Sequence, residues 1–205
     1  MLLDHRLLTT DAELERFSRL YALKSHGIPA TVAFLKQGDV RVFFYEDATD
    51  EWIAGYTVST TPPCRYLEVH TPEVRAELLA RHGLAETDIV EIGAIWMDPR
   101  ALLRDGRPMS QRYRWEIYQH MMGDAFAARR PIIMGGTVSP AIRAFQMQVT
   151  KRAFFDGEVT IGGKPQHIWQ YYTYRHDLWR DFFRATLREF GLEPGGGGTP
   201  MAIAA

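Results

Sequence analysis

A nearly continuous apolar run lies near the middle of the chain, in the segment DIVEIGAIWMDP, residues 88–99. Its length and its polar and proline borders predict a strand that is buried on both faces. One acid, Glu91, interrupts the run, and Gly93 follows two residues later. A glycine inside a strand favours a bulge or a close backbone approach. The pattern therefore predicts a buried strand that carries one carboxylate beside an irregularity in its pairing.

Periodic apolar positions predict the elements that precede this strand. Thr10 and Glu13 form a capping-box pattern, which opens a helix that Gly27 and Pro29 end. Residues 28–35 are compatible with a strand or a linker, and residues 39–45 and 52–59 predict the two strands of a hairpin. Thr71 before Pro72 predicts the start of another helix, and Gly83 predicts its end.

The same reasoning continues to the C-terminal end. Ser110 is expected to cap a long helix to about residue 128, a buried strand follows at 131–138, and Ser139-Pro140 starts a helix. Residues 158–161 and 167–174 predict a second hairpin, and residues 177–190 a final helix with Trp179, Phe182 and Phe183 facing inward. This order predicts an α/β fold, with a mixed sheet covered by helices. We expect a single domain over residues 1–192 and a flexible glycine-rich tail over 193–205.

Composition and charge narrow the classes of function. The 24 Lys and Arg balance the 25 Asp and Glu, so net charge gives no indication of nucleic-acid binding, and no nucleic acid is expected as a partner. The single cysteine, Cys64, argues against an internal disulfide, and no histidine spacing fits a metal site, so no metal is expected. No segment approaches the ~20 apolar residues of a membrane span. The N-terminus lacks a signal-peptide pattern, so we expect a cytoplasmic protein without a membrane span.

Glu91 is the leading candidate for chemistry. An amine that attacks a thioester must lose a proton, and a carboxylate can accept that proton directly or through water. Backbone N–H groups of residues 93–95, freed by a bulge at Gly93 and Ile95, are candidates to stabilise the oxyanion. Thr137, at the end of the second buried strand, is expected to face a cleft between strands 89–97 and 132–137. The alternative for Glu91 is a structural pairing with an arginine.

Two further groups of residues are candidates for binding the acyl donor. A basic segment with Arg100, Arg104 and Arg107 precedes Ser110, and arginines with a helix start suit the phosphate of a phosphopantetheine arm. The alternative is a solvated loop whose arginines pair with surface acids. Trp96 completes the candidate donor site. An acyl pocket is expected from Met97, Met121, Met122 and Phe145, because methionine adapts to flexible apolar chains; ordinary core packing is the alternative.

Several segments, taken in order, resemble one family. They are IAGYTVSTTPP followed by YLEVHTPEVRAELL, then VEIGAIWMDP, GGTVSPAIRAF and FFDGEVTIGGKPQHI. Their order and spacing over residues 52–174 resemble the acyl-homoserine-lactone synthases and the related long-chain N-acyl amino acid synthases, within the GNAT N-acyltransferase fold. The resemblance implies a mostly antiparallel central sheet flanked by helices and splayed between its two central parallel strands. It also implies that Glu91 is the family's strand glutamate.

The resemblance implies an enzyme that moves an acyl group to the amine of an amino-acid-like acceptor. The donor would be a thioester of acyl carrier protein or of coenzyme A, with no tightly bound cofactor, as in the synthesis of autoinducers for quorum sensing. Ala94 stands where the synthases have an arginine three residues after the strand glutamate. Acyl transfer is therefore better supported than lactone production, and use of S-adenosylmethionine stays open. The alternative is a non-catalytic relative that binds an acyl or small-molecule ligand in a biosynthetic or sensory role.

Overall fold

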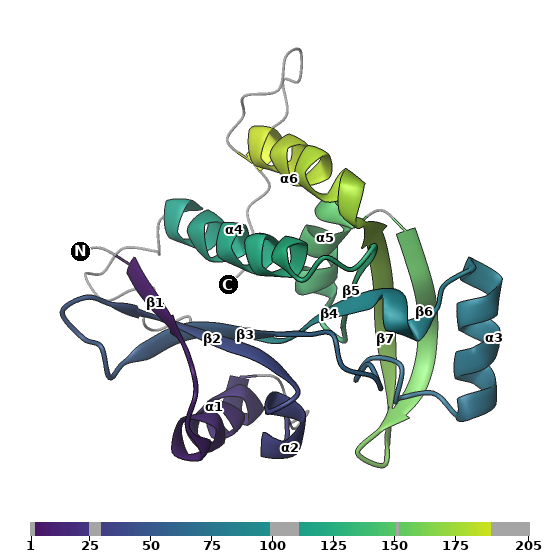
Figure 1. Cartoon of the computed structure of the whole chain (residues 1–205), viewed down its shortest axis with the longest axis horizontal. Coiled ribbons are helices and arrows are strands. Elements are labelled where there is room, and N and C mark those ends of the chain that lie inside the picture. Colours follow the sequence, from purple (N-terminus) through teal and green to yellow (C-terminus); the bar gives the residue numbers. More distant parts are fainter. Residues whose placement is uncertain (1–2, 25–29, 99–110, 151, 190–205) are drawn as a thin grey trace. The chain divides into compact units, whose positions relative to one another are not determined.

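A computed structural model describes residues 3–24, 30–98, 111–150 and 152–189 of the chain (Figure 1). The chain divides into two compact units. Unit 1 is drawn from Met1–Cys64 and Val90–Ala128, and unit 2 from Arg65–Ile89 and Arg129–Ala205. Each unit combines helices with antiparallel strands. The predicted class, a mixed α/β fold with mostly antiparallel strands flanked by helices, is confirmed.

Unit 1 contains four antiparallel strands that follow one another in sequence order. They are β1 (Leu3–Leu7), β2 (Gly38–Tyr45), β3 (Trp52–Ser59) and β4 (Ile89–Met97). One face is covered by two helices, α1 (Asp11–Lys24) and the short α2 (Val32–Leu35). The opposite face is covered by α4 (Gln111–Ala127) (Figure 1).

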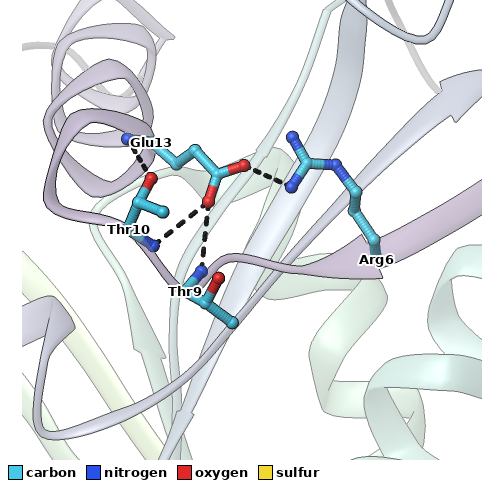
Figure 2. A network of polar contacts seen from close by, with 4 residues as sticks. All are labelled: Arg6, Thr9, Thr10 and Glu13. Atoms are coloured by element: carbon cyan, nitrogen blue, oxygen red, sulfur yellow. Dashed lines mark hydrogen bonds and ion pairs between the residues drawn. The ribbon is translucent and has the colours of Figure 1, made fainter.

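The start of α1 shows how a local sequence pattern fixes an element. The Glu13 N–H donates to Thr10 Oγ1 at 3.3 Å, and Glu13 Oε2 accepts from the N–H groups of Thr10 and Thr9, each at 3.2 Å (Figure 2). This is the predicted capping box, with one further donor. Arg6, from β1, pairs with the same carboxylate. The hydrogen bond from Arg6, together with the N–H groups of Thr9 and Thr10, outweighs desolvation and lowers the pKa of Glu13 to about 2.

The face of unit 1 beneath α1 is closely packed. Phe17 of α1 is fully buried and meets Trp96 of β4 edge to face, with ring centroids 6.0 Å apart. Gly55 of β3 permits this contact, because a methyl group there would lie 2.6 Å from the Phe17 ring. The cluster also includes Val40 and Val42 of β2. Burial of this apolar face fixes which side chains of β3 and β4 point toward α1.

Unit 2 contains three strands in the order β5 (Ile132–Thr137), β7 (Lys164–Tyr174), β6 (Arg152–Ile161), all antiparallel. α3 (Pro72–His82) lies on one side of these strands, while α5 (Pro140–Val149) and α6 (Arg175–Glu189) lie on the other (Figure 1). The predicted ends of α3 are confirmed. Thr71 caps its start, and Gly83 ends it in a left-handed conformation with φ 63°.

Four sequence predictions were wrong or incomplete. The sequence did not predict β1, because its residues are mostly exposed and form no apolar pattern. The ambiguous segment 28–35 contains the helix α2, and β6 begins at Arg152, six residues before the predicted start. In α6, Phe182 is buried as expected, but Trp179 and Phe183 are 42% and 63% exposed. The inward face of α6 is instead formed by residues at helical spacing around Phe182, namely Leu178, Phe182 and Ala185.

Two expectations about how the parts of the chain are arranged stay predictions. The first is the splay between the two central parallel strands, because these strands, β4 and β5, belong to different units. The single domain over residues 1–192 likewise concerns the placement of the two units.

Candidate active site

The pairing of β4 with β3 contains the irregularity that Gly93 predicts. Gly93 lies opposite Thr57, and Trp96 lies opposite Gly55, so β4 has one residue more than β3 over this interval. Ala94, inside the interval, adopts φ 45°, which is uncommon for a residue other than glycine. A bulge of this kind bends the strand and re-aims the backbone groups beside it. The predicted bulge is therefore confirmed, and Ile95 is part of it.

Glu91 lies just before the bulge and is almost completely buried, with 1% of its surface exposed. It pairs with Ser59 of β3 and shares a strand face with Gly93, two residues on. The Glu91 carboxylate lies beside the space that a side chain at position 93 would fill. A methyl group on Gly93 would lie 3.0 Å from Glu91 Oε1. The same methyl group would lie 3.3 Å from Thr57 Oγ1. Two oxygens from two strands thus flank one glycine.

This polar group lies on the face of β3 that also carries Gly55. Thr57 and Ser59 follow Gly55 at intervals of two residues, and Gly55 contacts Phe17 of α1. Ser59 Oγ donates to the Gln37 carbonyl at 3.1 Å and accepts from the Thr61 N–H at 3.3 Å. The Glu91 carboxylate and the Thr57 hydroxyl therefore belong to the α1 and α2 side of unit 1.

A second polar network occupies the opposite face of unit 1, beneath α4. Arg41 of β2 donates two hydrogen bonds to Asp124 of α4, at 2.7 and 3.0 Å. The Tyr56 hydroxyl donates to the same carboxylate at 2.7 Å, and Arg41 Nη1 lies 2.8 Å from His5 Nδ1. Burial and the bond to Asp124 raise the pKa of Tyr56. Burial first, then the charges of His120 and Arg41, lower the pKa of His5.

Four other predicted site residues lie in unit 1, on β4 and α4. Trp96 is 3% exposed and packs on α1, and Met97 pairs with Ala54 of β3. Met121 and Met122 are buried on α4, at 2% and 7% exposure. Their burial fits both the acyl pocket and the core packing that the sequence left open.

Thr137 ends β5, a strand of unit 2. Its hydroxyl accepts a hydrogen bond from the Ser139 N–H at 3.0 Å, just before α5. Arg100, Arg104, Arg107 and Ser110, and the side chain of Phe145, lie outside the described residues. Within the described ranges, no group of three or more His, Cys, Asp or Glu is placed to hold a metal ion. None of the described helices is long and apolar enough to cross a membrane.

Comparison with solved structures identifies the fold. The N-acyl amino acid synthase FeeM from uncultured soil microbes superposes with a TM-score of 0.65 at 11% identity, over 91% of this chain and 98% of that one. A putative acetyltransferase of Salmonella typhimurium, YncA, solved with acetyl-CoA, gives 0.52 at 7% identity, over 98% and 100%. A GNAT superfamily phosphinothricin acetyltransferase of Sinorhizobium meliloti, solved with acetyl-CoA, gives 0.52 at 13% identity, over 85% and 89%. The chain has the GNAT fold. No protein-family model matches it, and none of the curated proteins matches it in sequence.

Sequence reasoning named some residues of this candidate site and did not name others. It named Glu91 and the bulge, because an acid and a glycine are conspicuous in an apolar run. It missed Thr57, which lies 34 residues earlier in WIAGYTVS, where alternating small and polar residues were the available signal. It also missed the contacts of Asp124, because a helix acid gives no indication of its distant partners.

Proposed function

We propose that this chain is an N-acyltransferase that moves an acyl group from a thioester to the amine of an amino-acid-like acceptor. The burial of Glu91 beside Gly93, at the bulge of β4, is the observation that carries the proposal. Burial shifts the pKa values of carboxylates, and a bulge re-aims the backbone N–H groups beside it, so an acid at this position supports a catalytic task. The GNAT fold, with an N-acyl amino acid synthase among similar structures, supports the same reaction.

The reaction follows from the groups on β4. The acceptor nitrogen attacks the thioester carbonyl carbon, forming a C–N bond, and Glu91 takes the proton that the nitrogen loses, directly or through water. Backbone N–H groups at residues 93–95 stabilise the oxyanion of the tetrahedral intermediate. The C–S bond then breaks and the thiolate leaves, to be protonated as the free thiol. The products are one amide and one thiol.

The donor is a thioester of coenzyme A or of acyl carrier protein, and both carry an anionic phosphopantetheine arm. The basic segment with Arg100, Arg104 and Arg107, together with Ser110 and Trp96, is proposed to bind that arm. The methionines Met97, Met121 and Met122, with Phe145, are proposed to line the acyl chain. Thr137 is proposed as a second polar group for the reacting atoms. S-adenosylmethionine remains one candidate acceptor.

A thiol-release assay tests the proposal. The protein is incubated with acyl-CoA and acyl carrier protein thioesters of short and long chain length, each with a panel of amino acids and S-adenosylmethionine. We expect thiol release that requires both a thioester and an amine, with a matching amide in the mass spectrum. Binding of the thioester without amide formation from any acceptor would support the ligand-binding alternative and contradict the proposal.

A further inference from the structure

The hydroxyl of Thr57 on β3 has no hydrogen-bond partner in the part of the chain that the structure describes. The residue is 2% exposed. Ser59 on the same face provides the contrast, since its hydroxyl both donates to Gln37 and accepts from Thr61. A buried hydroxyl without a partner is unfavourable, and valine would fill the same space without this penalty. The presence of threonine therefore points to a group that Oγ1 binds.

The surroundings of Thr57 show where that group would bind. Thr57 lies directly opposite Gly93, and a methyl group on Gly93 would lie 3.3 Å from Thr57 Oγ1 and 3.0 Å from Glu91 Oε1. Any side chain at position 93 would thus crowd both oxygens. Glycine at this position leaves the space beside the carboxylate and the hydroxyl free of a side chain.

We infer that Thr57 is a positioning residue for proton transfer to Glu91, an inference that rests on the proposed function. A water molecule above Gly93 donates one O–H to Thr57 Oγ1 and the other to the Glu91 carboxylate. Its lone pair then faces the attacking nitrogen. During the reaction the water passes one proton to Glu91 and takes one from the nitrogen, so water is regenerated and Glu91 is protonated. Thr57 fixes the orientation of the water and exchanges no proton itself.

The first test compares Thr57→Val with Thr57→Ser, using the best thioester and amine from the assay above. Valine keeps the shape but loses the hydroxyl, whereas serine keeps the hydroxyl. We expect Thr57→Val to lower kcat by ~10-fold or more with little change in KM, which is a part of the ~10²–10⁴-fold that a general base contributes. Thr57→Ser should stay within about twofold of wild type. The stability of Thr57→Val toward denaturant should equal or exceed that of wild type, since no hydrogen bond of the fold is lost.

The second test fills the space at Gly93. Gly93→Ala should lower kcat, because its methyl group would crowd Thr57 Oγ1 and Glu91 Oε1. Gly123→Ala on α4 is the matched control, since a methyl group there meets nothing within 4 Å. The control should keep wild-type kcat. Equal kcat in Gly93→Ala and wild type would contradict an open water site at this position.

Two comparisons separate failure of this inference from failure of the proposed function. If Glu91→Gln keeps wild-type turnover, the proposed general base is wrong. If Glu91→Gln loses turnover while Thr57→Val keeps it, only the role of Thr57 is overturned.

An infrared measurement needs no substrate: the carboxyl band that disappears in Glu91→Gln should shift in Thr57→Val and stay unchanged in Thr57→Ser. An unshifted band in Thr57→Val would overturn the inference.

Discussion

His5 shows how a single neighbour fixes the protonation of a side chain. Arg41 Nη1 lies 2.8 Å from His5 Nδ1, and a guanidinium carries donors only, so Nδ1 must accept the hydrogen bond. His5 is therefore neutral, with its proton on Nε2. Asp4 and Asp124 favour the charged form, but burial, His120 and Arg41 outweigh them, and the pKa of His5 is lowered from 6.5.

This residue predicts a loss of stability in mild acid. Because the pKa of His5 is lower in the folded state than in the unfolded state, unfolding takes up a proton below pH 6.5. The free energy of unfolding should fall as the pH drops through 6.5 toward the folded-state pKa. Denaturant titrations at about pH 7.5 and about pH 5.5 measure this fall in wild type and in His5→Gln. His5→Gln should show the smaller fall, and an equal fall in both proteins would contradict the assignment.

At the scale of elements, α4 is attached to the sheet of unit 1 through one carboxylate. Asp124 accepts two hydrogen bonds from Arg41 and one from Tyr56, so it joins the helix to both β2 and β3. Asp124→Asn would leave the half-buried Arg41 cation without its counter-charge. We expect a loss of about 1.5–3 kcal/mol in the free energy of unfolding, the range for hydrogen bonds to charged groups. Denaturant titration measures it.

The adjacent residue supplies a control for that measurement. Gly123→Ala adds a methyl group to α4 that meets nothing within 4 Å. Alanine favours a helix over glycine by about 1 kcal/mol, so stability should be unchanged or slightly higher. Equal effects of the two substitutions would show that Asp124 does not attach α4.

Elements with local signals were predictable from the sequence, and elements defined by distant contacts were not. Thr10 with Glu13, Thr71 and Gly83 marked helix ends correctly, because caps depend on neighbours in the chain. β1 pairs with β2 from Leu3↔Tyr45 to Leu7↔Arg41, and no local pattern in its polar sequence indicates that pairing. In the candidate site, the burial of Glu91 was predictable because it interrupts an apolar strand. The role of Thr57 depends on the register that places it opposite Gly93.

At the scale of the whole molecule, the chain passes back and forth between the two units, and the strand that carries Glu91 follows one of these crossings. The chain enters unit 2 after Cys64 and returns to unit 1 at Val90, directly before Glu91. It leaves unit 1 again after Ala128. The strand that carries Glu91 thus follows a helix of unit 2 and precedes the basic segment and α4. Full-length protein is therefore the material for every functional measurement.

The basic segment predicts a salt-dependent use of the donor. Arg100, Arg104, Arg107, Arg112 and Arg114 fall within 15 residues of a chain with net charge −1. Arg104→Glu combined with Arg107→Glu should lower kcat/KM for the acyl donor at low salt, mainly by weakening association. The effect should shrink as salt rises, because exposed charges are screened beyond ~10 Å at 0.1 M.

A charge-matched pair in unit 2 controls for net charge. Lys164 and Arg184 are both exposed, so Lys164→Glu with Arg184→Glu changes the total charge equally. This control should keep the wild-type kcat/KM for the donor. If both double variants behave alike at low salt, the basic segment does not bind the donor.

The most direct test of the central claim is the rate of amide formation by wild type and by Glu91→Gln. Glutamine keeps the size and polarity of the side chain but cannot accept the proton. At saturating thioester and amine, we expect kcat to fall by ~10²-fold or more, the usual scale for a positioned general base. The two proteins should show similar thermal unfolding, so the loss reflects chemistry. A Glu91→Gln protein that forms amide at nearly the wild-type rate would contradict the account.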